Sequence, residues 1–503
     1  MTWLSTHGVA FAIALPLLMA AIVALLPRSR WLAWTVALAV VTAVAVAAMV
    51  VLQTQVSLGA FVYEMGGWEP PYGIALRIDA LNAPILMLIA AMAVLSLVYA
   101  EPAVRAEVSE RRGPAFYAAL LLCIAGLMGM VVTGDAFNVF VFLEVSSIST
   151  YTLVAIGANR DRRALSAAFN YLILGSIGAT FFVIGVGFLY AETGTLNMED
   201  IRRILANLDG GSRVAQVAFG FIVVGLGLKL ALFPLHTWLP GAYAYSPTVV
   251  TAFLASTATK AALYLLYRFC FTVFDPSFDY VAAVLTYVVT ALAVTGMIFA
   301  SLQAFFQTDA RRTLAFSSVA QVGYMLLGIG ILTVAGLAGS YLHLINHAVV
   351  KGGLFLALGA MWYRFGITRI SDMAGIAKTM PVTTAAFTVL AFSLIGVPFT
   401  AGFVSKVALA EAAAERGWWW AVAVIMVTSI IALFYMGRMM MTAYFNPPPA
   451  SCIDEAGVVE RREAPLLMLV PMVGLAVVSV LIGMRGNVVL TDVAENAARV
   501  MLP

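Results

Sequence analysis

Long apolar runs, separated by short polar segments, recur along almost the whole chain. A run of about 20 apolar residues is long enough to cross the hydrocarbon core of a bilayer as one α-helix. The longest polar segments, near 53–79 and 441–464, hold only about 25 residues each and are too short for a separate soluble domain. The pattern predicts an all-α polytopic membrane protein with fourteen spans, near 9–26, 32–52, 80–100, 114–132, 135–157, 166–190, 215–239, 247–270, 281–301, 313–333, 342–361, 383–410, 418–440 and 465–483.

Composition supports the membrane assignment. Hydrophobic residues make up 63% of the 503 residues and charged residues 11%, whereas soluble domains average about 25% charged residues. No Lys or Arg precedes the first apolar run, which argues against a cleaved signal peptide because such peptides need a positive leading region. Cys123, Cys270 and Cys452 show no CxxC spacing, so neither a disulfide framework nor a metal site is indicated.

The positive charges of the loops give an orientation. The odd-numbered loops between the predicted spans carry sixteen Lys and Arg residues, and the even-numbered loops with the termini carry eight. Cytoplasmic loops of membrane proteins hold the excess of Lys and Arg. We therefore expect the odd loops in the cytoplasm and both termini on the outer side of the membrane.

Four of the five lysines lie inside predicted spans: Lys229, Lys260, Lys351 and Lys406. An ammonium group at the centre of a bilayer costs roughly 2.5–3.5 kcal/mol on insertion scales. The cost falls when such groups face one another, water or carboxylates inside the bundle. This pattern indicates that the chain uses these lysines to move charge.

Glu144 lies near the middle of the fifth predicted span. A carboxylate at this depth is expected to be protonated or paired with a cation, and the simpler alternative is a polar residue that packs helices together. A pair between Glu144 and Lys229 that alternates between bonded and separated states would change the proton affinity of the next lysine. Asp135 is expected near the membrane interface and is given a supporting role.

Two spans contain helix-breaking residues beside a lysine. In the seventh, Lys229 is followed by Pro234 and His236, and in the twelfth Pro398 precedes Lys406. Interrupted helices at corresponding positions of two halves point to an inverted-repeat transporter and its ion path. The alternative is that membrane helices tolerate proline readily, so that either break alone would mean little.

The spacing of the two breaks predicts two inverted five-helix repeats, helices 4–8 and 9–13. The corresponding regions are 1–113 for the first three helices, 114–270 and 271–440 for the repeats, and 441–503 for a loop and the last helix.

The eleventh span places His343, His347 and Lys351 at steps of four residues, and therefore along one helical face. Histidine titrates near neutral pH, so this stripe predicts a proton relay. The HxxxH spacing also occurs in metal sites, but no third ligand is evident and the neighbouring lysine disfavours a cation. Lys260 completes the set, with Ser256, Thr257 and Thr259 beside it as groups able to hold water.

Several segments resemble the antiporter-like subunits shared by respiratory complex I, membrane-bound hydrogenases and multisubunit Mrp cation/proton antiporters. The resemblance covers roughly residues 75–440 and rests on FNVFVFLEVSSISTYTL, KLALFPLHTWLPGAYAYSPTVVTAFLASTATKAALY, QTDARRTLAFSSVAQVGYMLLGIG and HLINHAVVKGGLFL. The sequence WLP after the break is very specific to this superfamily.

The resemblance implies roles for individual residues. Glu144 and Lys229 match the ion pair, Lys260 the connecting lysine and Lys406 the terminal lysine that faces the exit. His343, His347 and Lys351 match the central relay positions, and the family fold has fourteen helices with two inverted repeats around broken helices.

Among the paralogues, the sequence most resembles the Mrp-type D subunits of multisubunit Na⁺/H⁺ antiporters. GGWEPPYGIALRIDALNAPIL and WLPGAYAYSPT support this choice, and lysine at position 406 disfavours the complex I protein that has glutamate there. The resemblance implies a subunit of a hetero-oligomeric Na⁺ (or K⁺)/H⁺ antiporter in a bacterial cytoplasmic membrane, in contact with lipid and with no cofactor or nucleic acid. The alternatives are a proton-pumping subunit of a redox-driven complex, whose chemistry would lie in partner subunits, and a purely structural scaffold.

Overall fold

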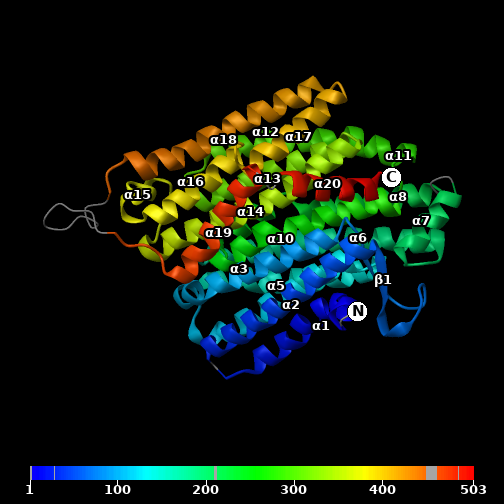
Figure 1. Ribbon diagram of the computed structural model, residues 1–503, viewed down its shortest axis with the longest axis horizontal. Coiled ribbons are helices and arrows are strands. Elements are labelled where there is room, and N and C mark those ends of the chain that lie inside the picture. Colours follow the sequence, from blue (N-terminus) through cyan, green and yellow to red (C-terminus); the bar gives the residue numbers. More distant parts are fainter. Residues whose placement is uncertain (1–2, 28, 209–211, 449–460, 485–486, 503) are drawn as a thin grey trace.

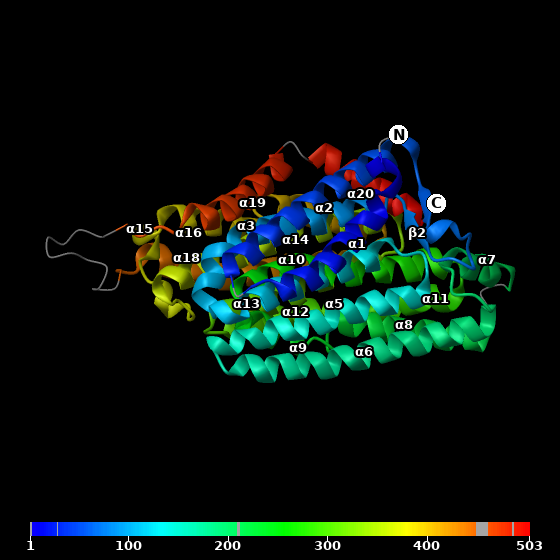
Figure 2. The same cartoon turned by 90° about the horizontal axis from the view of Figure 1, so that it is seen from below.

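The computed structural model describes residues 3–27, 29–208, 212–448, 461–484 and 487–502, so Arg28, Cys452 and Arg485 lie outside the described residues. Its helices run roughly parallel to one another (Figures 1 and 2). Their bounds are α1 (Trp3–Leu25), α2 (Arg30–Leu58), α3 (Ala83–Glu107), α4 (Gly113–Val132), α5 (Ala136–Ile156), α6 (Arg163–Thr193), α7 (Met198–Asn207), α8 (Arg213–Leu230), α9 (Trp238–Tyr245), α10 (Thr248–Tyr267), α11 (Asp279–Ala283), α12 (Thr290–Phe306), α13 (Ala310–Gly330), α14 (Val334–Phe365), α15 (Ile376–Thr379), α16 (Pro381–Ile395), α17 (Ala401–Glu415), α18 (Trp419–Phe445), α19 (Leu466–Met484) and α20 (Asn487–Met501).

The membrane-spanning helices confirm the predicted all-α polytopic class. Within the described residues, 13 helices are long and apolar enough to cross a membrane. The remaining predicted span is divided into α16 and α17, of 15 residues each, which lie end to end in the sequence. The interrupted seventh and twelfth spans are five positions apart in the order of spans, and a repeated unit of five spans, an odd number, enters the membrane from the opposite side the second time.

Both predicted breaks are present. The seventh span is α8 followed by the short α9; α8 ends at Leu230, and the next residue, Ala231, has a left-handed φ of 61°. The first half of the twelfth span ends at Ile395 and is followed by Gly396, with φ 95°, while Phe399 in the same break has φ 67°. A residue in the left-handed conformation ends a helix because it turns the chain away from the helix axis. This conformation costs roughly 1–2 kcal/mol for a residue that has a Cβ.

The centre of the molecule is formed by α10, α13 and α14. In the most apolar stretch of 18 residues, every residue of α13 and of α14 is buried. In the corresponding stretches of α1, α6 and α19 only 39% of the residues are buried, and apolar side chains face outward. At the α6–α8 contact, Gly178, Gly185 and Gly225 let the two backbones approach closely. The lysine-bearing helices α10 and α14 therefore lie in the most enclosed part of the bundle.

Three elements differ from the loops that the sequence predicts. The segment near 53–79 forms an antiparallel hairpin of β1 (Phe61–Glu64) and β2 (Ala75–Ile78), with Phe61 opposite Ile78. The amphipathic α7 lies between the sixth and seventh spans, and α20 follows α19. Both chain ends, the hairpin and α7 lie at one end of the bundle, opposite α15 (Figure 1).

Candidate functional site

Glu144 and Lys229 face the same contact between α5 and α8. The ammonium of Lys229 donates a 2.6 Å hydrogen bond to the hydroxyl of Ser147, three residues after Glu144. The ion pairs of the described residues do not include Glu144 with Lys229, so their charged atoms lie more than 4 Å apart. The buried Oε1 of Glu144 has no hydrogen-bond partner among the described residues. The structure therefore shows Lys229 hydrogen-bonded to Ser147 and not paired with Glu144.

The break after α8 places Lys229 next to the last residue of that helix. A cation in the last turn of a helix is favoured by the helix dipole. Pro234 and His236 lie in the break itself, between α8 and α9. The buried His236 ring stacks on Phe233, with ring centroids 5.1 Å apart, and its Nδ1 has no described hydrogen-bond partner.

Lys260 is 1% exposed on α10. Its ammonium donates to the backbone carbonyl of Ala255 and, over 3.3 Å, to the hydroxyl of Thr259. The hydroxyls of Ser256 and Thr257 instead donate to carbonyls of their own helix. Of the three hydroxyl side chains expected beside this lysine, only Thr259 contacts it.

The His343, His347 and Lys351 stripe is present on α14, which is one uninterrupted helix of 32 residues. The two imidazole rings stack with centroids 6.3 Å apart. His347 is buried, and neither ring nitrogen has a described hydrogen-bond partner. Lys351 is fully buried and donates to the Leu314 carbonyl and the Ser317 hydroxyl of α13, at 2.7 and 2.5 Å.

Lys406 lies in α17, just after the second break. Its ammonium donates to the carbonyls of Leu394 and Ile395, at 3.1 and 2.9 Å, and to the hydroxyl of Ser429 at 3.0 Å. The two carbonyls belong to the last turn of α16. Carbonyls in the last turn of a helix have no following helical N–H groups from which to accept a hydrogen bond. The lysine therefore caps one half of the broken helix from the other half, while Pro398 lies in the break between them.

Polar contacts join Lys406 to the histidine stripe. His343 contacts Ser405 Oγ through Nδ1 and Gln321 Oε1 through Nε2, each at 2.9 Å. The Tyr324 ring stacks on His343 with centroids 5.4 Å apart, and the Lys406 ammonium lies 4.9 Å from the centre of the same ring. These contacts form a continuous buried path from α14 to α17.

Helix packing extends this path toward α10. The helix α10, which carries Lys260, packs directly against α14: a Cβ at Gly352, next to Lys351, would lie 3.5 Å from Cβ of Ser256. The structure thus brings Lys260, His343, His347, Lys351 and Lys406 into one cluster and places Glu144 with Lys229 in a second. Asp135 lies in neither cluster: it caps α5 by accepting from the Asn138 N–H at 2.7 Å, and burial raises the pKa of its carboxyl above the ordinary value.

The sequence reasoning missed the neutral partners of the lysines. Ser147, Ser317 and Ser429 each accept a hydrogen bond from a different lysine, and Gln321 and Tyr324 contact His343. Serine pairs at 146–147 and 317–318 inside apolar spans were the available signal. A polar side chain in a membrane helix costs free energy when it faces lipid, and it is therefore expected to have a polar partner inside the bundle.

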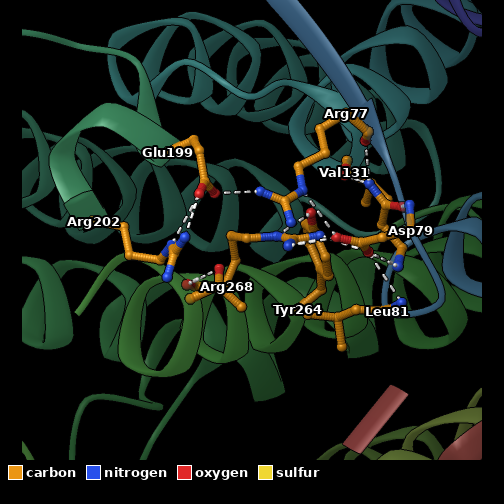
Figure 3. A network of polar contacts seen from close by, with 10 residues as sticks. Arg77, Asp79, Leu81, Val131, Glu199, Arg202, Tyr264 and Arg268 are labelled. Atoms are coloured by element: carbon orange, nitrogen blue, oxygen red, sulfur yellow. Dashed lines mark hydrogen bonds and ion pairs between the residues drawn. The ribbon is translucent and has the colours of Figure 1, made fainter. Parts of the chain in front are cut away.

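A buried ion-pair network at the end of the bundle that carries the hairpin was also missed. Arg268 lies at the end of the predicted span 247–270 but was counted with the positive charges of the even-numbered loops; it is 4% exposed in the π-helical turn η4 (Arg268–Val273), directly after α10. Figure 3 shows its guanidinium turned toward Asp79, with two hydrogen bonds of 2.8 and 2.9 Å. Arg77 joins Asp79 to Glu199 of α7. The network fastens the hairpin and α7 to the end of α10.

The Asp79 carboxyl belongs to the loop before α3. Burial by itself raises the pKa of Asp79, but the charges of Arg268 and Arg77 and the hydrogen bonds from Arg268 outweigh it and hold that pKa below the ordinary value. The carboxyl is therefore ionised in the folded protein at neutral pH.

The chemistry that these side chains can perform is proton transfer. They are amines, imidazoles and a carboxylate joined by hydroxyls, and each can hold or release a proton. Within the described residues no group of three or more His, Cys, Asp or Glu side chains is arranged to hold a metal ion. The roles of the individual residues stay predictions.

Comparisons with known proteins identify the family and the fold of the chain. The family model described as "NADH:quinone oxidoreductase/Mrp antiporter, TM" matches residues 133–432. The chain is 45% identical to NADH-quinone oxidoreductase subunit N of Desulforudis audaxviator over 391 residues, 78% of this chain and 76% of that protein. It is 34% identical to the D subunit of the Na(+)/H(+) antiporter of Alkalihalophilus pseudofirmus over 357 residues, 71% of this chain and 70% of that protein.

The fold is similar to that of a chain in the structure of the Mrp complex from Dietzia sp. DQ12-45-1b. The TM-score is 0.89 at 27% sequence identity, covering 99% of this chain and 98% of that chain. Family, relatives and fold together confirm the resemblance that the motifs indicated.

Proposed function

We propose, on the premise that the chain belongs to the NADH:quinone oxidoreductase/Mrp antiporter family of membrane subunits, that it is the proton-translocating subunit of a multisubunit Na⁺ (or K⁺)/H⁺ antiporter. In this proposal protons move along the buried axis of Glu144, Lys229, Lys260, His347 and Lys406, with His343 and Lys351 as further relay groups. Movement of the cation in the opposite direction is coupled to this proton movement within the whole complex.

One observation carries the proposal. Lys260, Lys351 and Lys406 are buried, and within the described residues no carboxylate oxygen lies within 4 Å of any of the three ammonium groups. A structural lysine in a membrane would pair with an acid or extend to the interface. A buried lysine that is held only by hydroxyls and carbonyls stabilises the fold no more than an apolar residue in its place would. Because no carboxylate fixes its charge, it is suited to gaining and losing a proton.

The two clusters suggest an order of events. When Glu144 approaches Lys229, the carboxylate favours the charged form of that lysine; when Lys229 returns to Ser147, its charge is free to act on the next group. Lys260 then passes a proton toward His347, and the path through His343 ends at Lys406. One elementary charge moved through 100 mV corresponds to roughly 2.3 kcal/mol, enough to shift the equilibrium of a hydrogen-bonded pair.

A second candidate is the proton-pumping subunit of a redox-driven complex. The 45% identity to a protein named NADH-quinone oxidoreductase subunit N favours it, and the matching family model covers both kinds of complex. Lysine at position 406 and the segment around GGWEPPYG favour the antiporter. The buried axis serves the same purpose in both candidates, and only the coupled reaction differs.

The proposed setting is a hetero-oligomeric complex in a bacterial cytoplasmic membrane, with the termini on the outer side. The matched Mrp chain is part of a complex, and the exposed apolar faces of the outer helices require lipid or other subunits. Labelling of an engineered cysteine at either terminus from outside intact cells tests the orientation, and labelling only after permeabilisation would contradict it.

The identity of the co-purifying subunits tests the coupled reaction. The tagged chain is extracted in mild detergent, and the subunits that accompany it are identified by mass spectrometry. Several small membrane proteins and one larger antiporter-like protein, without flavin or iron–sulfur proteins, would support the antiporter. Flavin, iron–sulfur or nickel subunits would make the chain the pump of a redox enzyme and would overturn the sodium coupling.

A further inference from the structure

A cavity of about 450 Å³ opens beside the start of α6, at the end of that helix opposite the one that leads into α7. Five arginines line it: Arg160, Arg163, Arg311, Arg312 and Arg369. Asp161 and Asp309 are the acidic residues of the lining, so the cavity carries a net charge of +3, five positive charges less two negative ones. Its wall combines the α5–α6 loop and α9 with the loops after α12 and α14, and it therefore lies between the two halves of the chain.

Only two of the five arginines have a carboxylate partner among the described residues. Arg163 pairs with Asp161 at 2.6 Å, and Arg160 pairs with Glu107 at 3.3 Å. The buried Arg311 is held by neutral groups, the Ser246 carbonyl and the Thr248 hydroxyl.

The remaining two arginines have unused donor groups. The buried Nε of Arg312 has no described hydrogen-bond partner, and Arg369 is exposed. Asp309 forms no ion pair with either arginine among the described residues; its carboxylate caps α13 by accepting from the backbone N–H of Arg312 at 2.8 Å. The cavity thus offers guanidinium groups that no carboxylate of the described chain occupies.

Apolar side chains flank the cavity on two helices. Phe306 ends α12 immediately before the cavity and is 73% exposed. On α6, which begins at Arg163, Leu165 is 51% and Phe169 is 61% exposed. The short α9 packs between α6 and α13. A charged cavity at the loop end of a bundle, bordered by outward-facing apolar side chains, matches the two parts of a phospholipid.

We propose that this cavity binds the phosphate headgroup of an anionic phospholipid from the adjoining leaflet, with its acyl chains along the exposed apolar residues of α6 and α12. Arginine suits this ligand because its planar group donates two parallel hydrogen bonds to phosphate oxygens. Basic pockets between membrane helices on the cytoplasmic side are a common form of lipid-headgroup site. The positive charge of the odd-numbered loops predicts that the cavity lies on that side.

The bound lipid would connect the two halves of the chain at the broken seventh helix. Arg160 already donates to the Ala244 carbonyl of α9, and Arg311 donates to the Ser246 carbonyl just after it. A phosphate shared by arginines from both halves would hold the end of α9 against α13. This inference is independent of the coupled ion, because it concerns binding and not transport.

The test uses the intact complex purified through a tag on this chain. Retained lipids are quantified by mass spectrometry for the wild type and for the double variant Arg312→Gln/Arg369→Gln, which alters the arginines with unused donors. The matched control is Arg111→Gln, an exposed arginine of another odd-numbered loop that does not line the cavity. Gel filtration verifies that each complex is assembled. We expect the double variant to retain at least about tenfold less anionic phospholipid than the control, because each lost hydrogen bond to a charged group weakens binding about tenfold or more.

Thermal unfolding of the delipidated complex distinguishes the source of the phosphate. Mixed micelles with phosphatidylglycerol should raise the unfolding midpoint of the wild type and of the control, but not that of the double variant. Mixed micelles with phosphatidylcholine should raise the midpoint of none of the three proteins. Equal lipid retention by all three proteins would overturn the proposal. An equal shift with phosphatidylcholine, or a shift of the same size with inorganic phosphate alone, would overturn it as well.

Discussion

Lys229 donates its hydrogen bond to Ser147 and not to Glu144, although both side chains belong to the same stretch of α5. In the proposed relay, Lys229 alternates between this neutral hydroxyl and the carboxylate of Glu144, which lies three residues earlier on the same helix. A group with two such positions can change its charge state without leaving the protein interior. This relationship is the structural basis of the proposed relay.

Replacing Ser147 with alanine removes the neutral acceptor. Lys229 is then expected to remain with Glu144, and proton translocation by the reconstituted complex should fall roughly tenfold, since a hydrogen bond to a charged group contributes about 1.5–3 kcal/mol. Ser149→Ala is the matched control, because the Ser149 hydroxyl donates to the Val145 carbonyl of its own helix. Equal proton flux in Ser147→Ala and the wild type would show that Ser147 takes no part.

The buried lysines should be expendable for stability but not for transport. Lys351→Met replaces a fully buried ammonium by an apolar chain of similar length, and such replacements are often neutral or stabilising. We expect an assembled complex whose unfolding midpoint is unchanged or raised and whose proton flux is lost. A strongly lowered midpoint would instead identify Lys351 as a structural residue.

The break between α16 and α17 should be sensitive to a single methyl group at Gly396. This residue has a φ of 95°, and a Cβ there would lie 3.0 Å from Cδ of Lys406. Gly396→Ala is therefore expected to destabilise the protein by about 1 kcal/mol or more and to displace the lysine. Gly437→Ala on α18, where a Cβ would meet no atom within 4 Å, should leave both the unfolding midpoint and the flux near the wild-type values.

The Asp79–Arg268 pair predicts a pH dependence of stability. The pKa of Asp79 is lower in the folded protein than its ordinary value of about 3.9. On acidification the Asp79 carboxyl is therefore protonated at a higher pH in the unfolded chain than in the folded protein. The stabilisation of the folded protein by the ionised Asp79 is complete at pH values above the pKa of Asp79 in the unfolded chain, and it is lost as the pH falls toward the pKa of Asp79 in the folded protein. Asp79→Asn should cost about 3–5 kcal/mol at neutral pH because it leaves Arg268 buried without its partner. Its unfolding midpoint should fall less between pH 6 and pH 3 than that of the wild type, and parallel curves would contradict this account.

The spans and the breaks were predictable because each depends on local sequence. An apolar run of about 20 residues has few alternatives to a membrane helix, and prolines beside Lys229 and Lys406 mark the interruptions directly. The stripe of His343, His347 and Lys351 follows from helical periodicity alone. These features need no knowledge of which helices are neighbours.

The partners of the lysines were not predictable in the same way. Lys229 meets Ser147 across 82 positions of sequence, and Lys351 meets Ser317 across 34, so both contacts depend on how the helices pack. Arg268 appeared to be a loop charge because it follows an apolar run, and the structure shows that Asp79 makes its burial possible. Pairing between distant segments decides which charges of a membrane protein are inside.

The proton flux of a Lys260→Met complex tests the central claim most directly. The wild type, Lys260→Met and the loop control Lys378→Met are reconstituted into liposomes, and an imposed Na⁺ gradient drives proton movement that a pH-sensitive dye reports. The account predicts flux in the wild type and in Lys378→Met, and none in Lys260→Met with the complex still assembled. Wild-type flux in Lys260→Met would contradict a proton path through the buried lysines.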